Sequence, residues 1–539
     1  MTYPISTSKK LKGDGCKRLK HMATEVTVHH SNWTRSLDDL STELLVLIFE
    51  QLRDIDSYTL ANARQLSRRF ESIIAPIQFD TIWLHERIIA HQAETYFPRV
   101  FRYLYSYTRH VNMGSDLEPV NTAILLDRMQ RLSSLRWRYM GSQRHPGCLS
   151  RPSHILSLEH IKANNIKLFI EDLPIIKFDD DFHDVYLQAF PANHIASLKM
   201  TSPLSPLTSR LECVKRLLLE AHHIETFHYS DRGQGQQFLF EANERLPAFE
   251  DLMLRSYDWN HSIEDVRGHW DFSRLRHLTL IDVPLFQFLS SVPYTELHHL
   301  RTLHCEDFST HLLDRRLEAT DGLYELVNQI QSLCNLKVTC HTNLFPVHGL
   351  LRHADSLRVL SFRDYVGFED EGRPCPTMWD KHLALLSRKL VGLQALELDM
   401  DVALCESSLF LRALCNFARL DTLVLHTQTV LRPLEDGEYP INEDWDYDAA
   451  LQTFSTLVHD KQGTPWRNIV ITVGGWKPAM ARRMSEVWRE WHKIGVYAER
   501  CFVLERNTET GEITIQEVGV AGSDSTLYSN VMDSMMKLR

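Results

Sequence analysis

A short phrase of the form Leu-Arg-x-Leu-x-apolar-x-Asp, where x is any residue, recurs in the second half of this 539-residue chain. The phrase and its looser relatives begin at Phe249, Leu275, Leu300, Leu333, Leu357, Leu393, Leu420 and Trp466. Successive starts are 26, 25, 33, 24, 36, 27 and 46 residues apart. The alternating apolar side chains predict a short strand in each unit, and the tighter intervals leave room for one helix or turn besides.

Units of this size cannot bury their apolar side chains alone. Each strand would direct two of them to one face, and stacked neighbours would bury them in one continuous core. The phrase resembles that of leucine-rich repeats. The resemblance implies an α/β fold, with an irregular leucine-rich-repeat-like solenoid over residues 85–474. Residues 85–248 carry only two candidate phrases, at Leu132 and Ile195, and residues 322–332 and 379–390 have helical periodicity.

A second constrained stretch lies near the start of the chain. Its apolar residues recur at helical spacing and predict a helix over residues 42–53: Leu44, Leu45, Ile48, Phe49 and Leu52. The expected helix starts are Ser41 or Thr42, then Asp56, then Ser67, and Pro76 is expected to end the third helix. A three-helix unit this small tends to need further burial against a partner or another part of the chain.

Two motifs in this stretch, Leu40-x-x-Glu43-Leu44-Leu45-x-x-Ile48-Phe49-x-x-Leu52 and Leu66-Ser67-Arg68-Arg69-Phe70, resemble an F-box over residues 37–84. Ser41 replaces a proline common in that family, and Phe70 occupies a position often held by tryptophan. The family binds the adaptor subunit that links substrate receptors to a cullin–RING ubiquitin ligase. The resemblance thus implies adaptor contacts from Leu40, Leu44, Leu45, Ile48, Phe49, Leu52, Leu66 and Phe70. The alternative is an amphipathic helical hairpin that belongs to a larger core.

The whole layout resembles the large, divergent F-box proteins of fungi that carry weak leucine-rich repeats. In such arrays the strand residues between the inward leucines face the concave side, where a protein target would bind. The corresponding candidates here are Thr279, His304, Lys337, Ser361 and Glu397, flanked by Met253 and Val424. Their chemistry is mixed and identifies no particular target. The expected function is the substrate-recognition subunit of an SCF-type ubiquitin ligase.

Charge and composition narrow the other possibilities. Residues 1–36, expected to be a disordered tail, hold seven basic and two acidic side chains, so their net charge is +5 and the rest of the chain carries −16. An acidic body of this kind argues against a large nucleic-acid surface. The tail is either a nuclear-import signal or a solvated leader. With no signal peptide and no membrane-length apolar run, the chain is expected in the cytoplasm, the nucleus or both.

An acidic run with three aromatic residues covers residues 435–448, inside the longest interval between phrases. It is interpreted as a loop that either contacts a basic partner or is only solvated. Residues 475–539 are expected to form a capping helix that starts at Pro478, a hairpin around residues 507–511, and a tail.

The search for catalytic or metal-binding motifs gives no candidate. The ten cysteines include no C-x-x-C pair, and Cys334, Cys340 and His341 lack the spacing of zinc ligands. We therefore expect no cofactor, no metal and no enzymatic activity of the chain itself. Two other classes stay open: an F-box scaffold that acts outside the ligase, and an unrecognised enzyme.

Overall fold

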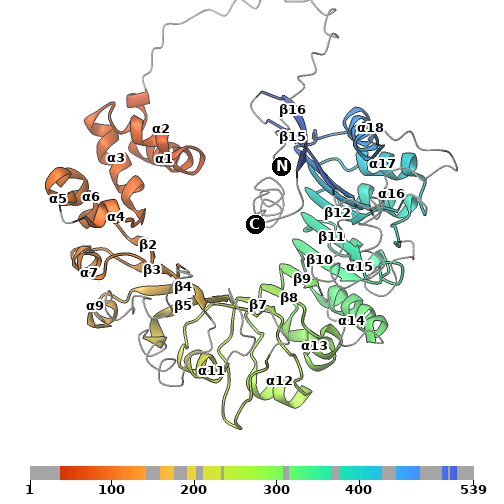
Figure 1. The fold of residues 1–539 in the computed structure, drawn as a ribbon, viewed down its shortest axis with the longest axis horizontal. Helices are drawn as coiled ribbons and strands as arrows, with labels where there is room; N and C mark the ends of the chain where they lie inside the picture. Colours follow the sequence, from red (N-terminus) through yellow and green to blue (C-terminus); the bar gives the residue numbers. More distant parts are fainter. Residues whose placement is uncertain are drawn as a thin grey trace, which may run out of the picture. The chain divides into compact units, whose positions relative to one another are not determined.

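A computed structural model describes residues 37–90, 92–140, 158–174, 191–201, 211–231, 236–306, 315–365, 375–401, 404–427, 445–473, 500–507 and 510–518 (Figure 1). The chain divides into two compact units, Met1–Gln78 and Phe79–Arg539. The basic tail of residues 1–36 and the expected helix from Pro478 lie outside the described residues.

The first unit contains a one-turn helix, η1 (Leu37–Asp39), and three helices, α1 (Thr42–Ile55), α2 (Ser57–Ala63) and α3 (Arg68–Phe79), of which only the last residue, Phe79, belongs to the second unit. The expected caps are confirmed. The Ser41 hydroxyl accepts a hydrogen bond from the Leu44 backbone N–H at 3.4 Å, and the Asp56 carboxylate accepts one from Tyr58 at 2.9 Å. Ser67 accepts one from the Phe70 backbone at 3.1 Å. These side chains satisfy backbone donors that a helix leaves unpaired at its first turn.

The prediction that Pro76 ends the third helix is wrong, because α3 continues through it to Phe79. Proline lacks an N–H and so removes one helical hydrogen bond, which normally disfavours an interior position. Here Ile77, the residue after the proline, packs against the apolar core of the unit. We infer that this burial offsets the lost hydrogen bond.

The second unit is built on one sheet of sixteen strands whose order in space is their order in sequence. Neighbours from β1 to β14 pair in parallel, and β14, β15 and β16 pair antiparallel. The strands are β1 (Thr81–Trp83), β2 (His110–Gly114), β3 (Ser134–Arg138), β4 (Lys167–Pro174), β5 (Ile195–Thr201), β6 (Thr226–Ser230), β7 (Asp251–Arg255) and β8 (His277–Ile281). They continue with β9 (Thr302–Glu306), β10 (Asn335–Cys340), β11 (Val359–Asp364), β12 (Ala395–Asp399), β13 (Thr422–Thr427), β14 (Asn468–Val473), β15 (Arg500–Arg506) and β16 (Ile513–Val518).

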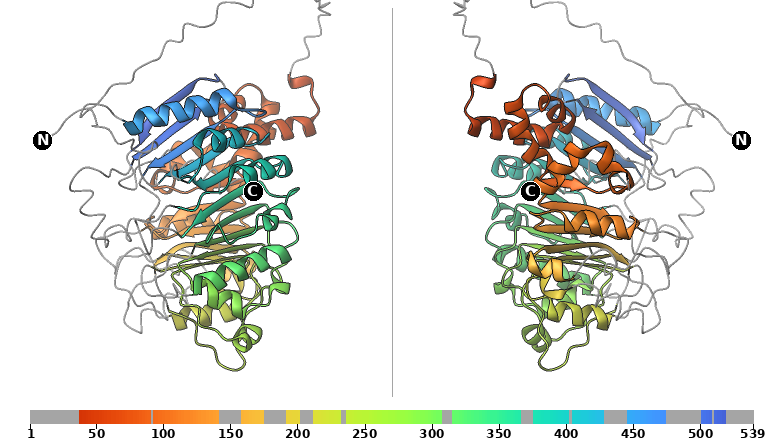
Figure 2. Two further views of the ribbon diagram at one scale, coloured as in Figure 1. Left: turned by 90° about the vertical axis from the view of Figure 1, so that its right-hand side faces the viewer. Right: turned by 90° about the vertical axis from the view of Figure 1, so that its left-hand side faces the viewer.

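Helices of the second unit follow the strands on one face of the sheet (Figure 1), and the views from the side show the strands stacked along the unit (Figure 2). They are α4 (Glu86–Ile89), α5 (Ala93–Tyr96), α6 (Pro98–Tyr107), α7 (Pro119–Asp127), α9 (Leu158–Ala163), α11 (Leu211–Glu220), α12 (Ile263–His269), α13 (Leu285–Ser291), α14 (Arg316–Gln329), α15 (His348–Leu351), α16 (Asp380–Lys389), α17 (Ser407–Cys415) and α18 (Trp445–Asp460). A parallel sheet needs such crossover connections between strands.

The strands that the recurring phrase predicts are confirmed. The eight phrases coincide with β7 to β14, and the two weaker candidates at Leu132 and Ile195 coincide with β3 and β5. The helical periodicity of residues 322–332 and 379–390 falls in α14 and α16. The segment 37–84 assigned to the F-box also includes β1, which pairs with β2 and so belongs to the sheet.

The end of the second unit confirms one expectation and corrects another. The hairpin around residues 507–511 forms, with β15 and β16 paired on either side of it. The acidic run of residues 435–448 is only partly a loop, because its last four residues begin α18. Tyr447 packs its ring against Phe502 of β15 at 6.1 Å, so this aromatic residue contributes to the fold. Residues 435–444 lie outside the described part.

Candidate functional site

Helix α1 is apolar on two sides, and only one of them is covered. Leu45 and Phe49 belong to the core of the first unit, together with Leu60 of α2 and Phe70, Ile73 and Ile74 of α3. The rings of Phe49 and Phe70 meet edge to face, with their centroids 5.2 Å apart. Leu40 and Leu52 are partly buried and pack against this core. The three helices are therefore joined by their own apolar interior.

The uncovered side of α1 presents Leu44, Leu47, Ile48 and Ile55. At 100° per residue these four positions fall within one arc of the helix, about a third of a turn wide. Leu44 is 50% exposed and Ile55 is 81% exposed. Tyr58 at the start of α2 and Leu66 before α3 are exposed as well. We call Leu44, Leu47, Ile48, Ile55, Tyr58 and Leu66 the α1 surface.

The predicted adaptor contacts thus fall into three groups. Leu44, Ile48 and Leu66 are exposed and available to a partner. Leu40 and Leu52 are partly buried. The side chains of Leu45, Phe49 and Phe70 are buried in the unit itself, so their assignment as direct contacts is corrected to a supporting role.

Sequence reasoning missed Leu47, Ile55 and Tyr58 of the α1 surface. For the two α1 residues, the missed signal was that Leu44, Leu47, Ile48 and Ile55 form a second apolar stripe beside the first one. Arg69 of α3 fixes the segment that precedes α1. Its guanidinium donates hydrogen bonds to the carbonyl oxygens of Asp38 and, at 2.6 Å, of Leu40. These bonds hold the chain that enters α1 against α3.

The strand positions predicted to bind a target differ in their accessibility. Thr279 of β8 is half-buried, but His304, Ser361 and Glu397 are buried. Lys337 of β10 is partly buried and pairs with a neighbouring strand. The prediction that these five residues form an open contact surface is therefore corrected for His304, Ser361 and Glu397, whose side chains a partner cannot reach in this structure.

A charged cluster joins β9 to β10 on that face. The Lys337 ammonium lies 2.7 Å from a Glu306 carboxylate oxygen, and His304 Nε2 lies 3.0 Å from the same oxygen. Burial opposes ionisation of Glu306, but the close approach of His304 and the charge of Lys337 outweigh it and lower the pKa to about 2. Burial likewise opposes the charge of Lys337, yet Glu397 and Glu306 raise its pKa. The pair is ionised at neutral pH.

A second polar cluster joins β12, β13 and β14. His426 Nε2 lies 2.8 Å from the Glu397 carboxylate, and Nδ1 lies 2.6 Å from the Thr472 hydroxyl. Burial, with a smaller effect of Arg363, lowers the pKa of His426. Neutral imidazole fits these contacts when Nε2–H donates to Glu397 and Nδ1 accepts from Thr472. These groups hold one another across the strands and leave no reactive group exposed.

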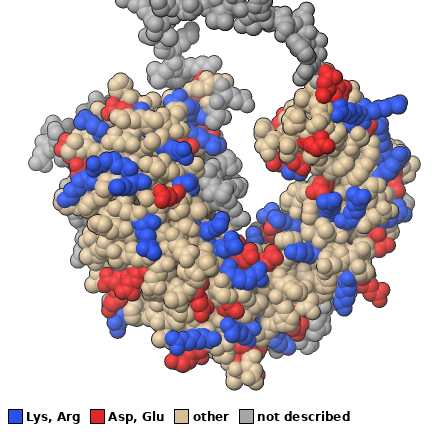
Figure 3. Space-filling model, turned by 180° about the vertical axis from the view of Figure 1, so that it is seen from behind, with Lys and Arg blue, Asp and Glu red and all other residues tan. Residues whose placement is uncertain are grey.

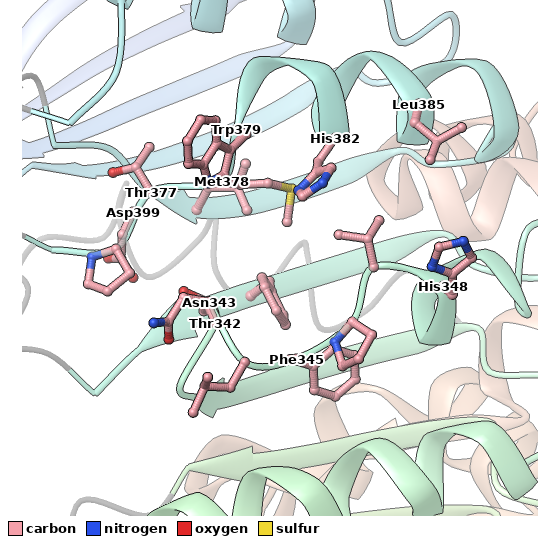
Figure 4. A pocket seen from close by; sticks show the side chains of 16 residues that line it. Thr342, Asn343, Phe345, His348, Thr377, Met378, Trp379, His382, Leu385 and Asp399 are labelled. Atoms are coloured by element: carbon pink, nitrogen blue, oxygen red, sulfur yellow. The ribbon is translucent and has the colours of Figure 1, made fainter.

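A groove opens where the chain leaves the carboxyl ends of β10 and β11, beside the last residues of β12 (Figure 4). It has a volume of about 390 Å³ and is lined by the residues after β10, including Asn343 and Phe345, and by Trp379 and His382 at the start of α16. A neighbouring hollow of about 540 Å³ shares Asn343 and Trp379 with it. Trp379 is 65% exposed beside it. The groove offers an aromatic and apolar surface that a side chain of a protein partner could enter.

Surface charge gives no comparable signal on the face seen in Figure 3, where basic and acidic side chains are interspersed. Within the described residues, no group of three or more His, Cys, Asp or Glu side chains could hold a metal ion. Among the helices described, none is long and apolar enough to cross a membrane. The searches for relatives add nothing to these observations, because no model of a known protein family and no curated protein matches the chain.

Proposed function

We propose that this chain is the substrate-recognition subunit of a cullin–RING ubiquitin ligase. The observation that carries the proposal is the α1 surface, a set of exposed aliphatic and aromatic side chains on a small helical unit that already has its own core. Exposed apolar side chains grouped in this way mark interaction sites. The F-box resemblance of the same segment names the partner, the adaptor subunit of the ligase.

The second unit would then act as an irregular leucine-rich-repeat-like array that holds a protein target. Support comes from the sequential order of its parallel strands, each followed by a connection on the same face. The groove beside Trp379 is the accessible part of this unit that best suits a target side chain. Ubiquitin transfer would be accelerated by proximity, with the chemistry supplied by other subunits.

The experiment that tests the proposal is a pull-down of the intact chain beside Leu44→Asp/Ile48→Asp, with the co-purified proteins identified by mass spectrometry. Both substitutions place a carboxylate on the α1 surface without entering the core of the unit. We expect adaptor and cullin with the intact chain and neither with the variant, since a buried unpaired carboxylate is costly at an apolar interface.

Thr42→Asp/Arg53→Gln is the matched control. It changes the net charge by the same two units on exposed positions of α1 that lie on the other side of the helix from Leu44. This variant should retain both partners. If the intact chain captures no adaptor, the proposal is wrong; if it captures adaptor without cullin, the chain is a scaffold outside the ligase.

A further inference from the structure

Two hollows meet beside Trp379 in the second unit. The first is the groove of about 390 Å³, in which the residues after β10 face the start of α16 (Figure 4). The second, of about 540 Å³, lies between the start of α16 and the start of α17. Both volumes fall within the range of about 300 to 1,000 Å³ that is usual for ligand pockets. Trp379 lines both, and we call the two hollows together the Trp379 site.

The first hollow is suited to an apolar side chain. Most of its lining is apolar and includes Leu344, Phe345, Met378, Leu385 and Leu398. Asp399 is the one carboxylate among its described lining residues. Its two oxygens already accept hydrogen bonds, one from the Arg363 guanidinium at 3.1 Å and one from the Asp364 backbone N–H at 2.8 Å. An apolar side chain that enters this hollow leaves water without displacing a polar contact of the protein.

The second hollow is acidic. Asp380 in the first turn of α16 and Glu406 just before α17 both line it. Carboxylates are common at helix N-termini, where they interact favourably with the helix dipole. Within the described residues, however, Asp380 has no basic partner, and Glu406 accepts a hydrogen bond from the Ser408 hydroxyl alone, at 2.9 Å. Among the described residues that line the two hollows there is no lysine or arginine. Both carboxylates are therefore available to a cation.

The exposed indole of Trp379 adds a second attraction for positive charge. The Lys381 ammonium lies 4.8 Å from the centroid of this ring, as expected for the negative face of an indole. Lys381 is exposed and lines neither hollow, and its single charge offsets at most one of the two carboxylates. An arginine of a partner suits the site better than a lysine. Its planar guanidinium can stack on an aromatic ring and donate hydrogen bonds to two carboxylates at once.

We propose that the Trp379 site binds a protein segment in which an arginine and a large apolar residue lie two positions apart. The arginine pairs with Asp380 and Glu406 beside the Trp379 ring, and the apolar side chain enters the first hollow. In an extended segment such side chains point to the same side and are about 7 Å apart, which suits two hollows that share Asn343 and Trp379. The assignment of this segment to a ligase target rests on the proposed function.

A selection of short random peptides displayed on phage, with the intact chain as bait, tests the proposal. We expect the enriched peptides to share an arginine two positions from Leu, Met, Phe or Trp. A fluorescent synthetic peptide of the enriched sequence then gives the Kd by anisotropy. Asp380→Asn/Glu406→Gln should raise this Kd at least tenfold, because it removes both charges that face the arginine. Trp379→Ala should raise it by a similar factor.

The matched control is Asp355→Asn/Glu264→Gln. It removes the same two charges from exposed positions outside both hollows and should leave the Kd unchanged. The proposal is overturned if the selection yields no binder or if the enriched peptides lack the arginine. It is also overturned if Asp380→Asn/Glu406→Gln binds the peptide as tightly as the control does.

The peptide assay is separate from the test of the ligase function, because it requires no adaptor. Leu44→Asp/Ile48→Asp should bind the peptide with the Kd of the intact chain, since both substitutions lie on the α1 surface of the first unit. Peptide binding by a chain that captures no adaptor would overturn the proposed function and leave the Trp379 site as a binding site. Adaptor capture without peptide binding would overturn the Trp379 site alone.

Discussion

Leu44 and Leu45 are neighbours in α1 with opposite environments. Leu44 is 50% exposed and Leu45 is fully buried. Truncation of the same side chain should therefore have different consequences at the two positions. We expect Leu45→Ala to destabilise the first unit by about 2 to 5 kcal/mol, as is usual for a buried leucine. Leu44→Ala should change its stability by no more than about 0.5 kcal/mol.

Hydrogen exchange over α1 to α3, read by mass spectrometry, gives both effects, and a binding assay with the adaptor separates contact from support. Leu44→Ala should weaken adaptor binding while it keeps native exchange protection. Equal loss of protection in the two variants would show that α1 does not have one covered and one open side.

His261 predicts an effect of pH in the second unit. It packs among aromatic rings beside Trp259 and Trp270, and its Nε2 lies 2.8 Å from the Tyr257 hydroxyl. Burial lowers its pKa from 6.5 to about 4. In the unfolded chain His261 is protonated below pH 6.5, whereas in the folded chain it is protonated only below about pH 4. Stability from this residue is complete above pH 6.5 and is lost progressively as the pH falls to about 4.

The loss should be about 2 to 3 kcal/mol, since one pKa unit corresponds to about 1.4 kcal/mol and the site is not wholly closed. The measurement is the free energy of unfolding from urea titrations at several pH values between 7 and 4. His261→Gln should reduce the slope in this range. A slope that stays the same in His261→Gln would mean that another group causes the loss of stability.

At the scale of elements, the strands were predictable where one leucine phrase is repeated and not elsewhere. Leu278 and Leu280 of β8 lie in the core, as the alternation predicts. Strands β2 and β4 likewise place buried side chains in the core, such as Val111 and Ile170, but their sequences lack the phrase. A strand defined by its neighbours in the sheet leaves little signal in its own sequence.

Burial of the candidate target-binding residues could not be predicted from their strands for the same reason. Glu397 follows the pattern of a residue between two inward leucines, yet it is enclosed by Lys337 and His426 from other strands. Whether solvent reaches the sheet face that the helices leave uncovered depends on segments that are distant in sequence. Likewise, α1 has a period that identifies two apolar stripes, but only the packing of α2 and α3 decides which of them is covered.

The pair of Lys337 and Glu306 predicts how β9 and β10 depend on each other. Lys337→Met keeps the length of the side chain but removes the charge that stabilises the buried Glu306 carboxylate. We expect a loss of about 2 kcal/mol, less than the ~3 to 5 kcal/mol for a fully buried pair because the Lys337 side chain is 25% exposed. The pKa of Glu306 should rise.

Denaturation by urea measures the loss, and Lys389→Met in the exposed last turn of α16 is the matched control with an expected change below about 0.5 kcal/mol. If Lys337→Met is as stable as the control, the ion pair between Lys337 and Glu306 makes no net contribution to the free energy of unfolding.

At the scale of the whole molecule, the sequential sheet implies that the effect of a mutation declines with distance along the array. Each strand of the second unit pairs only with its neighbours in sequence. Energetic coupling should therefore pass mainly from one strand to the adjacent strand. The first unit has its own core and should respond separately. A strongly destabilising substitution in the middle of the array should therefore reduce protection from hydrogen exchange near the substituted residue and leave both ends of the chain folded.

Trp259→Ala tests this expectation. Trp259 is fully buried and packs against Trp270 and Phe288, with ring centroids 4.9 and 4.7 Å away, and its indole N–H donates a hydrogen bond to the Ser291 hydroxyl at 2.9 Å. Removal of the ring should cost about 3 to 5 kcal/mol. Hydrogen exchange should accelerate most over β7, β8 and α13, less over β12 and β13, and not at all over α1 to α3. Trp379→Ala, the same substitution at a residue that is 65% exposed, should leave all of these rates near their native values. Uniform acceleration by Trp259→Ala over both units would instead mean that the chain unfolds as one cooperative body.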